Sequence, residues 1–451
     1  MVDLLKEGMP VILPVLLIIA GEAGFLRTLK KMDGKLQVFE IGVLYSAIVL
    51  VYAIVPCFTF LAGGLTYSPL SDGRLFADQP SPRNEAPIYW YYLLFLACFA
   101  LTYCASRGRP KRKSLKVSTP EGSTVWILLA CYLAIRIFFV YTRFHYNIED
   151  PESYGESYLL YKGLPLILQQ MLNHLGGLAL TLQLLLMAVM TFNYRKYRSI
   201  ILCWIALEFA GSVLFGIGSR SMLFTLMLSF LITYHVAVKR ISMRAIAVVS
   251  FLGLFLFLSL GIIRDLSTSL PDAEFSLLTS GDEFESVFAN AYDLRQLKEA
   301  GETKEIFPRL YFADLMNLIP AQLSPFRKLD LAEWYVETFY PSLADKGGGL
   351  AFGVISEAIV GLGWFDVLWR GAVLGWMFAQ IHKICFVGSQ SFWSYGFYLW
   401  TTVLSYNTFR TSTFALLPRA FYQFAILFFV VRISSSLLVV KRASDRAMTP
   451  V

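Results

Sequence analysis

Long apolar runs separated by short polar connections dominate this chain. A helix needs about 20 mostly apolar residues to cross roughly 30 Å of hydrocarbon at about 1.5 Å per residue. On that basis we predict transmembrane helices at residues 10–26, 38–61, 88–104, 125–142, 165–191, 199–217, 221–238, 245–263, 364–387, 392–408 and 420–438. The predicted fold class is therefore all-α, a polytopic transmembrane bundle of about eleven spans.

The composition agrees with the pattern. Of the 451 residues, 56% are hydrophobic and only 16% are charged, and the mean hydropathy is +0.57. Soluble domains are about 45–50% apolar and about 25% charged, so disordered, collagenous and ordinary cytosolic classes are excluded. The net charge of +7 comes from short basic blocks between apolar runs, where lysine and arginine set membrane topology rather than bind nucleic acid.

The distribution of lysine and arginine predicts the orientation of the bundle. Segments 27–37, 105–116, 193–198, 239–244, 382–391 and 439–446 hold 20 of these residues, whereas the alternate segments 1–8, 66–87, 143–164, 218–221 and 407–419 hold 8. Basic connections stay on the cytoplasmic side. We therefore predict an outside N-terminus and an inside C-terminus.

This orientation determines how residues 350–363 are interpreted. A full span there would move the basic segment 441–446 to the outside, so we predict an outward-side or re-entrant helix followed by a span from Trp364. The predicted organisation is then N-terminal transmembrane helices at 1–263, a periplasmic cap loop at 264–363, and C-terminal transmembrane helices with a cytoplasmic tail at 364–451.

The predicted cap is far longer than the other outward connections. Its 16 Asp and Glu outnumber its 8 Lys and Arg, and its aromatic and aliphatic residues recur at helical spacing. Residues 311–319 and 331–340 are the clearest predicted helices. A structureless loop of this length would be unusual, so we expect a folded, helical cap.

Arginines at the outward ends of the predicted helices are the main candidate binding residues. The positive-inside rule disfavours them there, so several at one level indicate an anionic ligand. Guanidinium binds phosphate oxygens in pairs and stays charged. For any one arginine, contact with lipid headgroups or cap carboxylates is an equal alternative; as a group we assign to a pyrophosphate or phosphate-lipid site Arg220, Arg264, Arg309, Arg327, Arg410 and Arg419.

Carboxylates are the candidates for a general base that activates a hydroxyl group. Glu357 ranks first because it lies in an otherwise apolar segment, and Asp314 in the cap is the second catalytic candidate. Glu283 and Glu285 are further possibilities, although most acidic residues of such a loop are simply solvated. Glu208 lies within a predicted span, where lining a cavity and helix–helix hydrogen bonding are equally good explanations.

Metal and cofactor chemistry have little support in the sequence. Gln169, Gln170, Asn173 and His174 form a polar strip in one span, and a structural role for His174 is favoured over a catalytic one. No HExxH, paired-cysteine or DxD-type pattern occurs, so we predict no metal. Neither a P-loop nor a GxGxxG motif occurs, so we predict no nucleotide cofactor.

Four segments in a fixed order resemble the O-antigen polymerase family of bacterial surface-polysaccharide polymerases. They are GIGSRSML (216–223), PRLYFADLMNLIP (308–320), GGGLAFGVISEAIVGLGWFDVL (347–368) and FRTSTFALLPRAF (409–421). Arg264 closes a predicted span between the first two. The resemblance covers residues 199–438 and rests on this order rather than on one short motif.

The resemblance implies an enzyme of the bacterial inner membrane with a bundle like that of the C-type glycosyltransferases. Such polymerases join repeat units carried on undecaprenyl pyrophosphate at the periplasmic face, and undecaprenyl pyrophosphate departs. Implied partners are lipid-linked glycan donor and acceptor, membrane lipids and a chain-length regulator protein, with no nucleic acid. Related enzymes are often discussed with a periplasmic histidine; the cap segment 264–363 has none, so the resemblance leaves the base unassigned.

Two alternatives stay open at this point. A flippase or transporter of lipid-linked oligosaccharide would be expected to show internal repeats and charges near the membrane midplane, and neither is evident. An O-antigen ligase, which passes finished glycan to the lipid A core, is poorly separated from a polymerase by the sequence.

Overall fold

The computed structural model of the chain describes residues 2–63, 82–108, 120, 122–146, 160, 162–214, 220–242, 244–246, 248, 282–319, 329–345, 350–387 and 391–434. These residues form helices and turns, with no β-strand among them. The predicted all-α fold class is confirmed for this part of the chain. The predicted span at 245–263 falls almost entirely outside the described residues.

Several helices are long and apolar enough to cross a membrane. Within the described ranges there are six such segments, namely Met9–Asp33, Ile41–Phe58, Glu85–Ser106, Gly122–Thr142, Ile167–Phe192 and Leu416–Ser434, and a shorter apolar helix covers Leu223–Val238. This set supports a membrane protein with several spans. The larger number of spans stays a prediction.

Two of the predicted spans differ in the structure for local reasons. The predicted span 392–408 is only α16 (Phe392–Leu404), about 20 Å of helix at 1.5 Å per residue, because the chain turns before the short helix α17 (Asn407–Arg410). The predicted span 199–217 corresponds to α7 (Tyr194–Leu214), whose first turns carry basic residues. By contrast, α15 (Trp364–Phe386) begins at the predicted residue.

The chain divides into two compact units, each built from separated segments. The first unit comprises Met1–Arg112, Ser269–Gly388 and Leu404–Pro418; the second comprises Lys113–Thr268, Ser389–Val403 and Arg419–Val451. These units group residues by contact, whereas the predicted division at 263 and 363 follows the chain. The units found by contact therefore do not test the predicted division along the chain.

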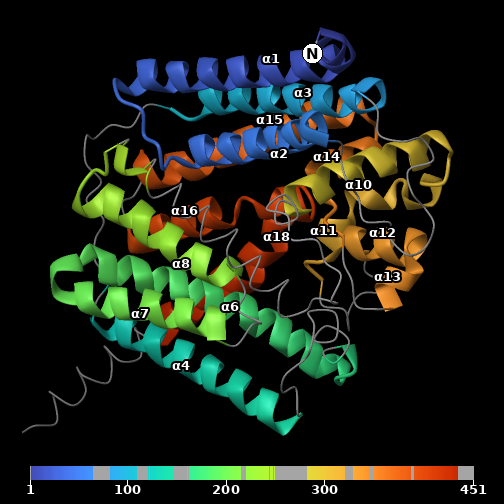
Figure 1. Cartoon of the computed structure of the whole chain (residues 1–451). Coiled ribbons are helices and arrows are strands. Elements are labelled where there is room, and N and C mark those ends of the chain that lie inside the picture. The colour runs from blue at the N-terminus through green and yellow to red at the C-terminus, as the bar shows by residue number, and fades with distance from the viewer. Residues whose placement is uncertain are drawn as a thin grey trace, which may run out of the picture. The chain divides into compact units, whose positions relative to one another are not determined.

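A helix bundle forms one part of the first unit. Figure 1 shows α1 (Val2–Asp33), α3 (Pro82–Ser106) and α15 side by side, with α2 (Ile41–Gly63) packed against them. Gly371 and Gly375 of α15 face α3 so closely that a Cβ would lie 2.6 Å from the carbonyl oxygen of Phe95 and 2.5 Å from that of Phe99. This small-xxx-small spacing lets the two backbones approach, as in membrane helix pairs.

The described part of the predicted cap belongs to the same unit and is helical. It contains α10 (Asp282–Glu299), the 3₁₀ turns Lys304–Ile306 and Arg309–Tyr311, α11 (Ala313–Met316), α12 (Leu331–Phe339), α13 (Pro341–Asp345) and α14 (Gly353–Val360). The predicted helix 331–340 is confirmed as α12, which begins where the Asp330 side chain accepts hydrogen bonds from the backbone N–H groups of Ala332 and Glu333. The predicted helix 311–319 is shorter than expected.

A buried core holds the cap helices together. Leu294 of α10, Leu331 and Phe339 of α12, and Val360 of α14 belong to one apolar cluster. Every residue of α14 is buried, and its eight residues extend only about 12 Å. This length agrees with the prediction that residues 350–363 do not form a full span.

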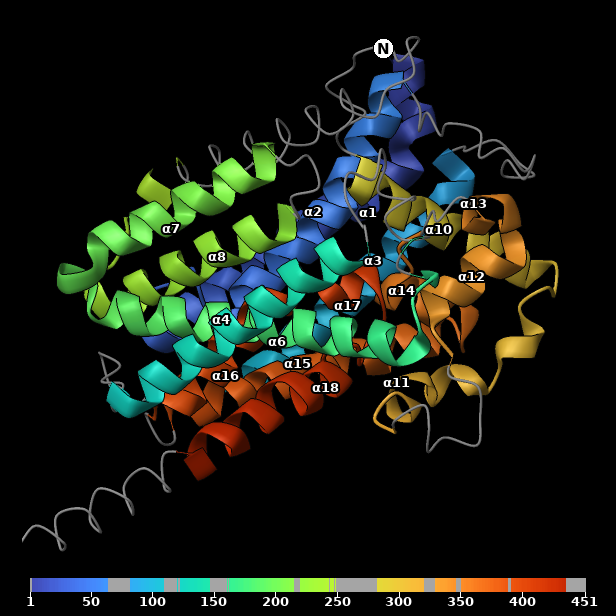
Figure 2. The same ribbon diagram turned by 90° about the horizontal axis from the view of Figure 1, so that it is seen from below.

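The second unit is a separate set of packed helices. In Figure 2 the green and teal helices α4 (Gly122–His145), α6 (Leu166–Phe192), α7 and α8 (Arg220–Thr233) lie next to one another. A π-helical turn, Tyr234–Val238, extends α8, and another, Ala420–Ala425, lies within the last apolar helix, Leu416–Ser434. The indole N–H of Trp400 in α16 donates to the Thr181 hydroxyl of α6 at 2.9 Å.

Candidate active site

The two predicted catalytic carboxylates lie in the first unit, on different short helices. Asp314 is in the first turn of α11, and Glu357 is in the middle of α14. Both side chains are buried, with 9% and 2% of their surfaces exposed. A buried carboxylate is costly unless it is hydrogen-bonded or paired, so their partners determine what each can do.

One turn of the chain, residues 412–414, binds both carboxylates. The Ser412 hydroxyl donates to Asp314 Oδ1 at 2.7 Å, and the backbone N–H of Phe414 donates to Asp314 Oδ2 at 3.1 Å. Between them, Thr413 donates to Glu357 Oε2 through its backbone N–H at 2.7 Å and through its hydroxyl at 2.6 Å. Three consecutive residues therefore bring together acids that are 43 positions apart.

The turn is held in place by the start of α14. The backbone N–H groups of Phe352 and Gly353 donate to the carbonyl oxygens of Arg410 and Thr411, each at 3.0 Å. Gly353 has a φ of +85°, and a Cβ there would lie 2.2 Å from the carbonyl oxygen of Phe409. Only glycine meets both demands without strain.

Arg370 of α15 is the cation of the site. Its Nη1 lies 2.7 Å from Glu357 Oε2 and also donates to the Thr413 hydroxyl. Its Nη2 lies 3.5 Å from Asp366 Oδ2, one turn earlier on the same helix. Only 1% of this side chain is exposed, so the charge of Arg370 is balanced inside the protein by Glu357 and Asp366. We call Asp314, Glu357, Asp366, Arg370 and residues 412–414 the carboxylate cluster.

Asp366 has a structural place in this cluster. Its Oδ2 accepts hydrogen bonds from the Tyr311 hydroxyl at 2.8 Å and from the Leu362 backbone N–H at 3.1 Å, and its Oδ1 accepts from the Trp369 indole at 2.6 Å. Both oxygens therefore have protein donors. Asp366 fixes the 361–363 turn and two aromatic side chains.

Arg370 keeps unused donor capacity. Its Nε and Nη2 have no hydrogen-bond acceptor within the described part of the chain. Its guanidinium carbon lies 4.9 Å from the Trp369 ring centre and 5.7 Å from that of Tyr311, distances at which a cation is attracted to an aromatic ring. The guanidinium is thus fixed in position inside the protein, with two nitrogens that no described residue accepts a hydrogen bond from.

The two carboxylates differ in their electrostatic surroundings. Burial, and next the negative charge of Glu357, raise the pKa of Asp314 to about 6, although the bonds from Ser412 and Phe414 and the charge of Arg370 act in the other direction. Glu357 has the ion pair with Arg370. Neighbouring acids held in unlike environments are typical of acid–base sites. Asp314 is the member suited to exchange a proton near neutral pH.

The predicted arginines have more varied positions. Arg309 is exposed, and Arg410 is half-buried with its backbone carbonyl bonded to Phe352. Arg220 is the first residue of α8, but its side chain is not among the described atoms. Arg264 and Arg327 lie wholly outside the described residues. Arg419 ends α18 (Leu416–Arg419) and belongs to the second unit. Their convergence on one ligand stays a prediction.

The remaining nominated residues lie outside the carboxylate cluster. Glu208 and His174 belong to the second unit, where Glu208 accepts a hydrogen bond from the Trp204 indole at 3.3 Å and the ring of His174 lies 4.9 Å from that of Tyr422. The side chains of Glu283 and Glu285 lie outside the described part. Among described residues, no group of three or more His, Cys, Asp or Glu is arranged to hold a metal ion.

Sequence reasoning missed Arg370 and Asp366. Arg370 lies neither at a predicted helix end nor in the cap, but well inside the apolar helix α15. The signal was present in WFDVLWRGAV (364–373), because an acid and a base at i and i+4 in such a helix face the same side and ionisable residues there are rarely without a role.

Comparisons of this chain with protein-family models, with curated proteins and with solved structures find no match.

Proposed function

We propose that this protein is a membrane glycosyltransferase that polymerises oligosaccharide repeat units carried on undecaprenyl pyrophosphate, with the carboxylate cluster as its active site. One observation carries the proposal. Three of the four segments that resemble O-antigen polymerases meet in this cluster. Residues 308–320 contribute Asp314, residues 347–368 contribute Glu357, and residues 409–421 contribute the 412–414 turn that binds both acids. Arg370, just after the second segment, pairs with Glu357.

In the proposed reaction, Asp314 takes the proton from a hydroxyl group of the acceptor repeat unit. The hydroxyl oxygen forms a bond to the anomeric carbon of the growing glycan, and the bond from that carbon to the pyrophosphate oxygen breaks. Undecaprenyl pyrophosphate leaves with the bonding electron pair. A carboxylate with a pKa of about 6 is suited to this step, because a general base works best with a pKa near the working pH.

The reaction also needs positive charge near the leaving pyrophosphate. Pyrophosphate is a good leaving group, and fixed donors that face the developing negative charge lower the barrier without a metal ion. In our proposal the Nε and Nη2 groups of Arg370 contribute from inside the cluster, and Arg410 binds the diphosphate. Glu357 orients Arg370 through the ion pair at 2.7 Å.

The proposed setting is the periplasmic face of the bacterial inner membrane. The uneven distribution of lysine and arginine supports this orientation, with the cap and the 412–414 turn on the outer side. The proposed bundle of about eleven spans is of the C-type glycosyltransferase kind. Proposed partners are lipid-linked donor and acceptor, surrounding lipids and a chain-length regulator.

The direct test is polymerisation by the purified protein. Reconstituted into nanodiscs with undecaprenyl-pyrophosphate-linked repeat units, the protein should produce a ladder of lengthened glycans on the lipid carrier. Arg410→Ala should reduce the ladder while single units remain. A protein that moves these lipids across liposome membranes without forming glycosidic bonds would instead be a flippase. One that transfers glycan only when lipid A core is supplied would be a ligase.

A further inference from the structure

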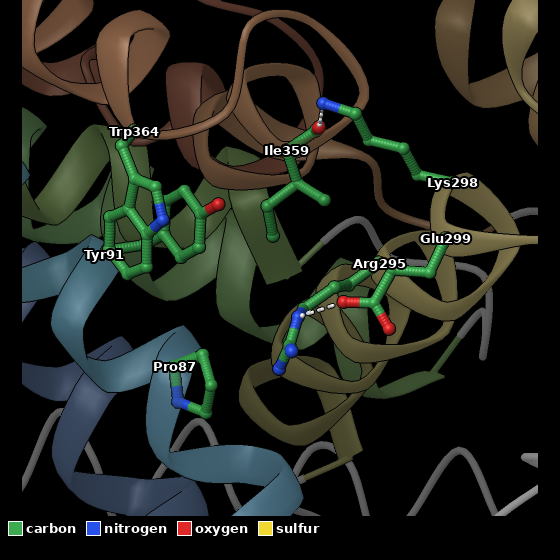
Figure 3. Close-up of a pocket in the computed structure, with 7 residues that line it drawn as sticks. All are labelled: Pro87, Tyr91, Arg295, Lys298, Glu299, Ile359 and Trp364. Atoms are coloured by element: carbon green, nitrogen blue, oxygen red, sulfur yellow. Dashed lines mark hydrogen bonds and ion pairs between the residues drawn. The ribbon is translucent and has the colours of Figure 1, made fainter.

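A second feature of the first unit is a pocket beside the carboxylate cluster. Figure 3 shows this cavity, of about 380 Å³, where α3, the end of α10, the end of α14 and the start of α15 come together. Its volume lies within the range of ligand pockets, about 300–1,000 Å³. The residues that line it are Pro87, Tyr91, Arg295, Lys298, Glu299, Ile359 and Trp364.

A pair of stacked aromatic rings forms one wall of this pocket. The rings of Tyr91 and Trp364 are nearly parallel, with an angle of 6° between their planes and 3.9 Å between their centres. Tyr91 is buried, whereas Trp364 keeps 45% of its surface exposed. Tyr91 therefore fixes the plane of the indole, and part of the indole stays open to a ligand.

The polar groups of the pocket offer both donors and acceptors. Arg295 Nε lies 2.9 Å from Glu299 Oε1, and both side chains remain partly exposed. The Lys298 ammonium donates to the carbonyl oxygens of Ile359 and Gly361 at 2.7 and 2.6 Å, so two of its three protons are already used.

This combination favours a neutral polyhydroxylated ring over a phosphate. A carboxylate on the same wall repels a dianion, and the lysine is occupied by backbone carbonyls. A pyranose ring has weakly positive C–H groups that pack on the negative face of an indole. Its hydroxyl groups can accept from Arg295 and donate to Glu299, because such groups both donate and accept.

A short turn separates the pocket from the carboxylate cluster. In residues 361–363, the carbonyl oxygen of Gly361 accepts from Lys298 on the pocket side, while the N–H of Leu362 donates to Asp366 on the cluster side. A Cβ on Gly363 would lie 3.3 Å from the Tyr91 hydroxyl. A ligand in the pocket would therefore lie against the same turn that Asp366 fixes.

We propose that the Tyr91–Trp364 pocket binds one pyranose ring of the glycan, as a sugar subsite next to the carboxylate cluster. The inference rests on the proposed function for the origin of the sugar. Binding itself needs no transfer reaction, because the subsite contains none of the residues of the cluster.

The experiment measures sugar binding by saturation-transfer NMR on the full-length protein in nanodiscs. The probes are methyl glycosides of neutral hexoses, 6-deoxyhexoses and N-acetylhexosamines, with inorganic pyrophosphate and phosphatidylglycerol as competing probes. At least one glycoside should bind, and Trp364→Ala should weaken that binding at least tenfold. Glu299→Gln should weaken it severalfold.

A neighbouring residue supplies the matched control. Phe365 is also a large aromatic residue at the start of α15, 64% exposed, but it does not line the pocket. Phe365→Ala should leave glycoside binding unchanged. An equal loss in Phe365→Ala would mean that both rings only anchor the helix end at the membrane surface, as aromatic belts do, and would overturn the inference.

The other outcomes are equally decisive. No binding of any glycoside, or displacement of a bound glycoside by pyrophosphate or phosphatidylglycerol at the wild-type pocket, would overturn the sugar subsite. If glycoside binding depends on Trp364 but the wild type forms no polymer, the subsite stands and the polymerase proposal fails. If the wild type forms polymer but glycoside binding does not depend on Trp364, the polymerase proposal stands and the subsite fails.

Discussion

Two buried arginines of the first unit are used in different ways. Arg107, just after α3, donates through Nη1 to Asp33 at 2.9 Å and through Nη2 to Glu40 at 2.6 Å, and it forms further bonds to both acids through Nε and Nη2. The Tyr103 hydroxyl also donates to Glu40, at 2.6 Å. Every nitrogen of this guanidinium has an acceptor.

Arg370 has the opposite arrangement. Only its Nη1 makes hydrogen-bond contacts, while Nε and Nη2 keep no acceptor in the described residues. The nearby Asp314 has a raised pKa. A satisfied network fixes three helix ends, whereas a partly satisfied network keeps binding capacity at a cost in stability. In our proposal Arg107 therefore has a structural role and the carboxylate cluster a chemical one.

The sharpest test of the comparison is Asp314→Asn. The amide keeps the size of the side chain but cannot take a proton, so we expect the polymerisation rate to fall about 10²–10⁴-fold, the usual contribution of a general base. The thermal midpoint of unfolding should change little. Glu305→Gln, an exposed cap carboxylate, is the matched control and should keep full activity. Wild-type rates in Asp314→Asn would remove Asp314 from the mechanism.

Arg107→Ala should damage the fold instead. It leaves Asp33 and Glu40 buried without their cation, which typically costs about 3–5 kcal/mol. Thermal unfolding in detergent should show a large fall in the midpoint. Arg295→Ala removes a partly exposed pair with Glu299, and a pair of this kind is worth about 0.2–1 kcal/mol. Equal midpoints for the two variants would contradict the structural role.

Gly353→Ala tests the link between α14 and the 412–414 turn. The added Cβ meets the Phe409 carbonyl and requires an unfavourable backbone conformation, which costs about 1–3 kcal/mol. We expect a lower unfolding midpoint together with reduced polymerisation, since the turn binds both acids. Gly24→Ala, at a helical position with no atom within 4 Å of the new Cβ, should be neutral or stabilising. A neutral Gly353→Ala would show that the turn does not depend on this contact.

Much of the helical framework could be predicted from hydropathy. The start of α15 at Trp364 and the short, non-spanning α14 both follow from apolar length and basic flanks. Helix lengths were less predictable where tertiary contacts interrupt an apolar run. The Phe409 ring packs against Tyr45, Tyr52 and Phe95, which fixes α17 in the first unit and ends α16 earlier than the hydropathy predicts.

Two acids of the proposed site could be nominated from the sequence, but the way they come together could not. Asp314 and Glu357 were nominated because each is an acid in apolar surroundings, and their shared turn depends on hydrogen bonds from Ser412, Thr413 and Phe414 that no local pattern encodes. Glu357 ranked first in the sequence, but in the structure it pairs with Arg370, so our proposal takes Asp314 as the base. The burial of Asp314 and the charges of Glu357 and Arg370 beside it depend on the folded structure. The spacing of these residues along the sequence does not reveal them.

The pH dependence of polymerisation tests the central claim most directly. If Asp314 is the base, the wild-type rate should fall on the acid side with a midpoint near its pKa of about 6. The negative charge of Glu357 raises the pKa of Asp314, and the positive charge of Arg370 lowers it. Glu357→Gln removes the first charge and leaves the second without its partner. The pKa of Asp314, and with it the acid midpoint of the rate, should therefore move to lower pH. An acid midpoint that is identical in wild type and Glu357→Gln, in proteins that remain folded, would contradict the assignment of the carboxylate cluster as the active site.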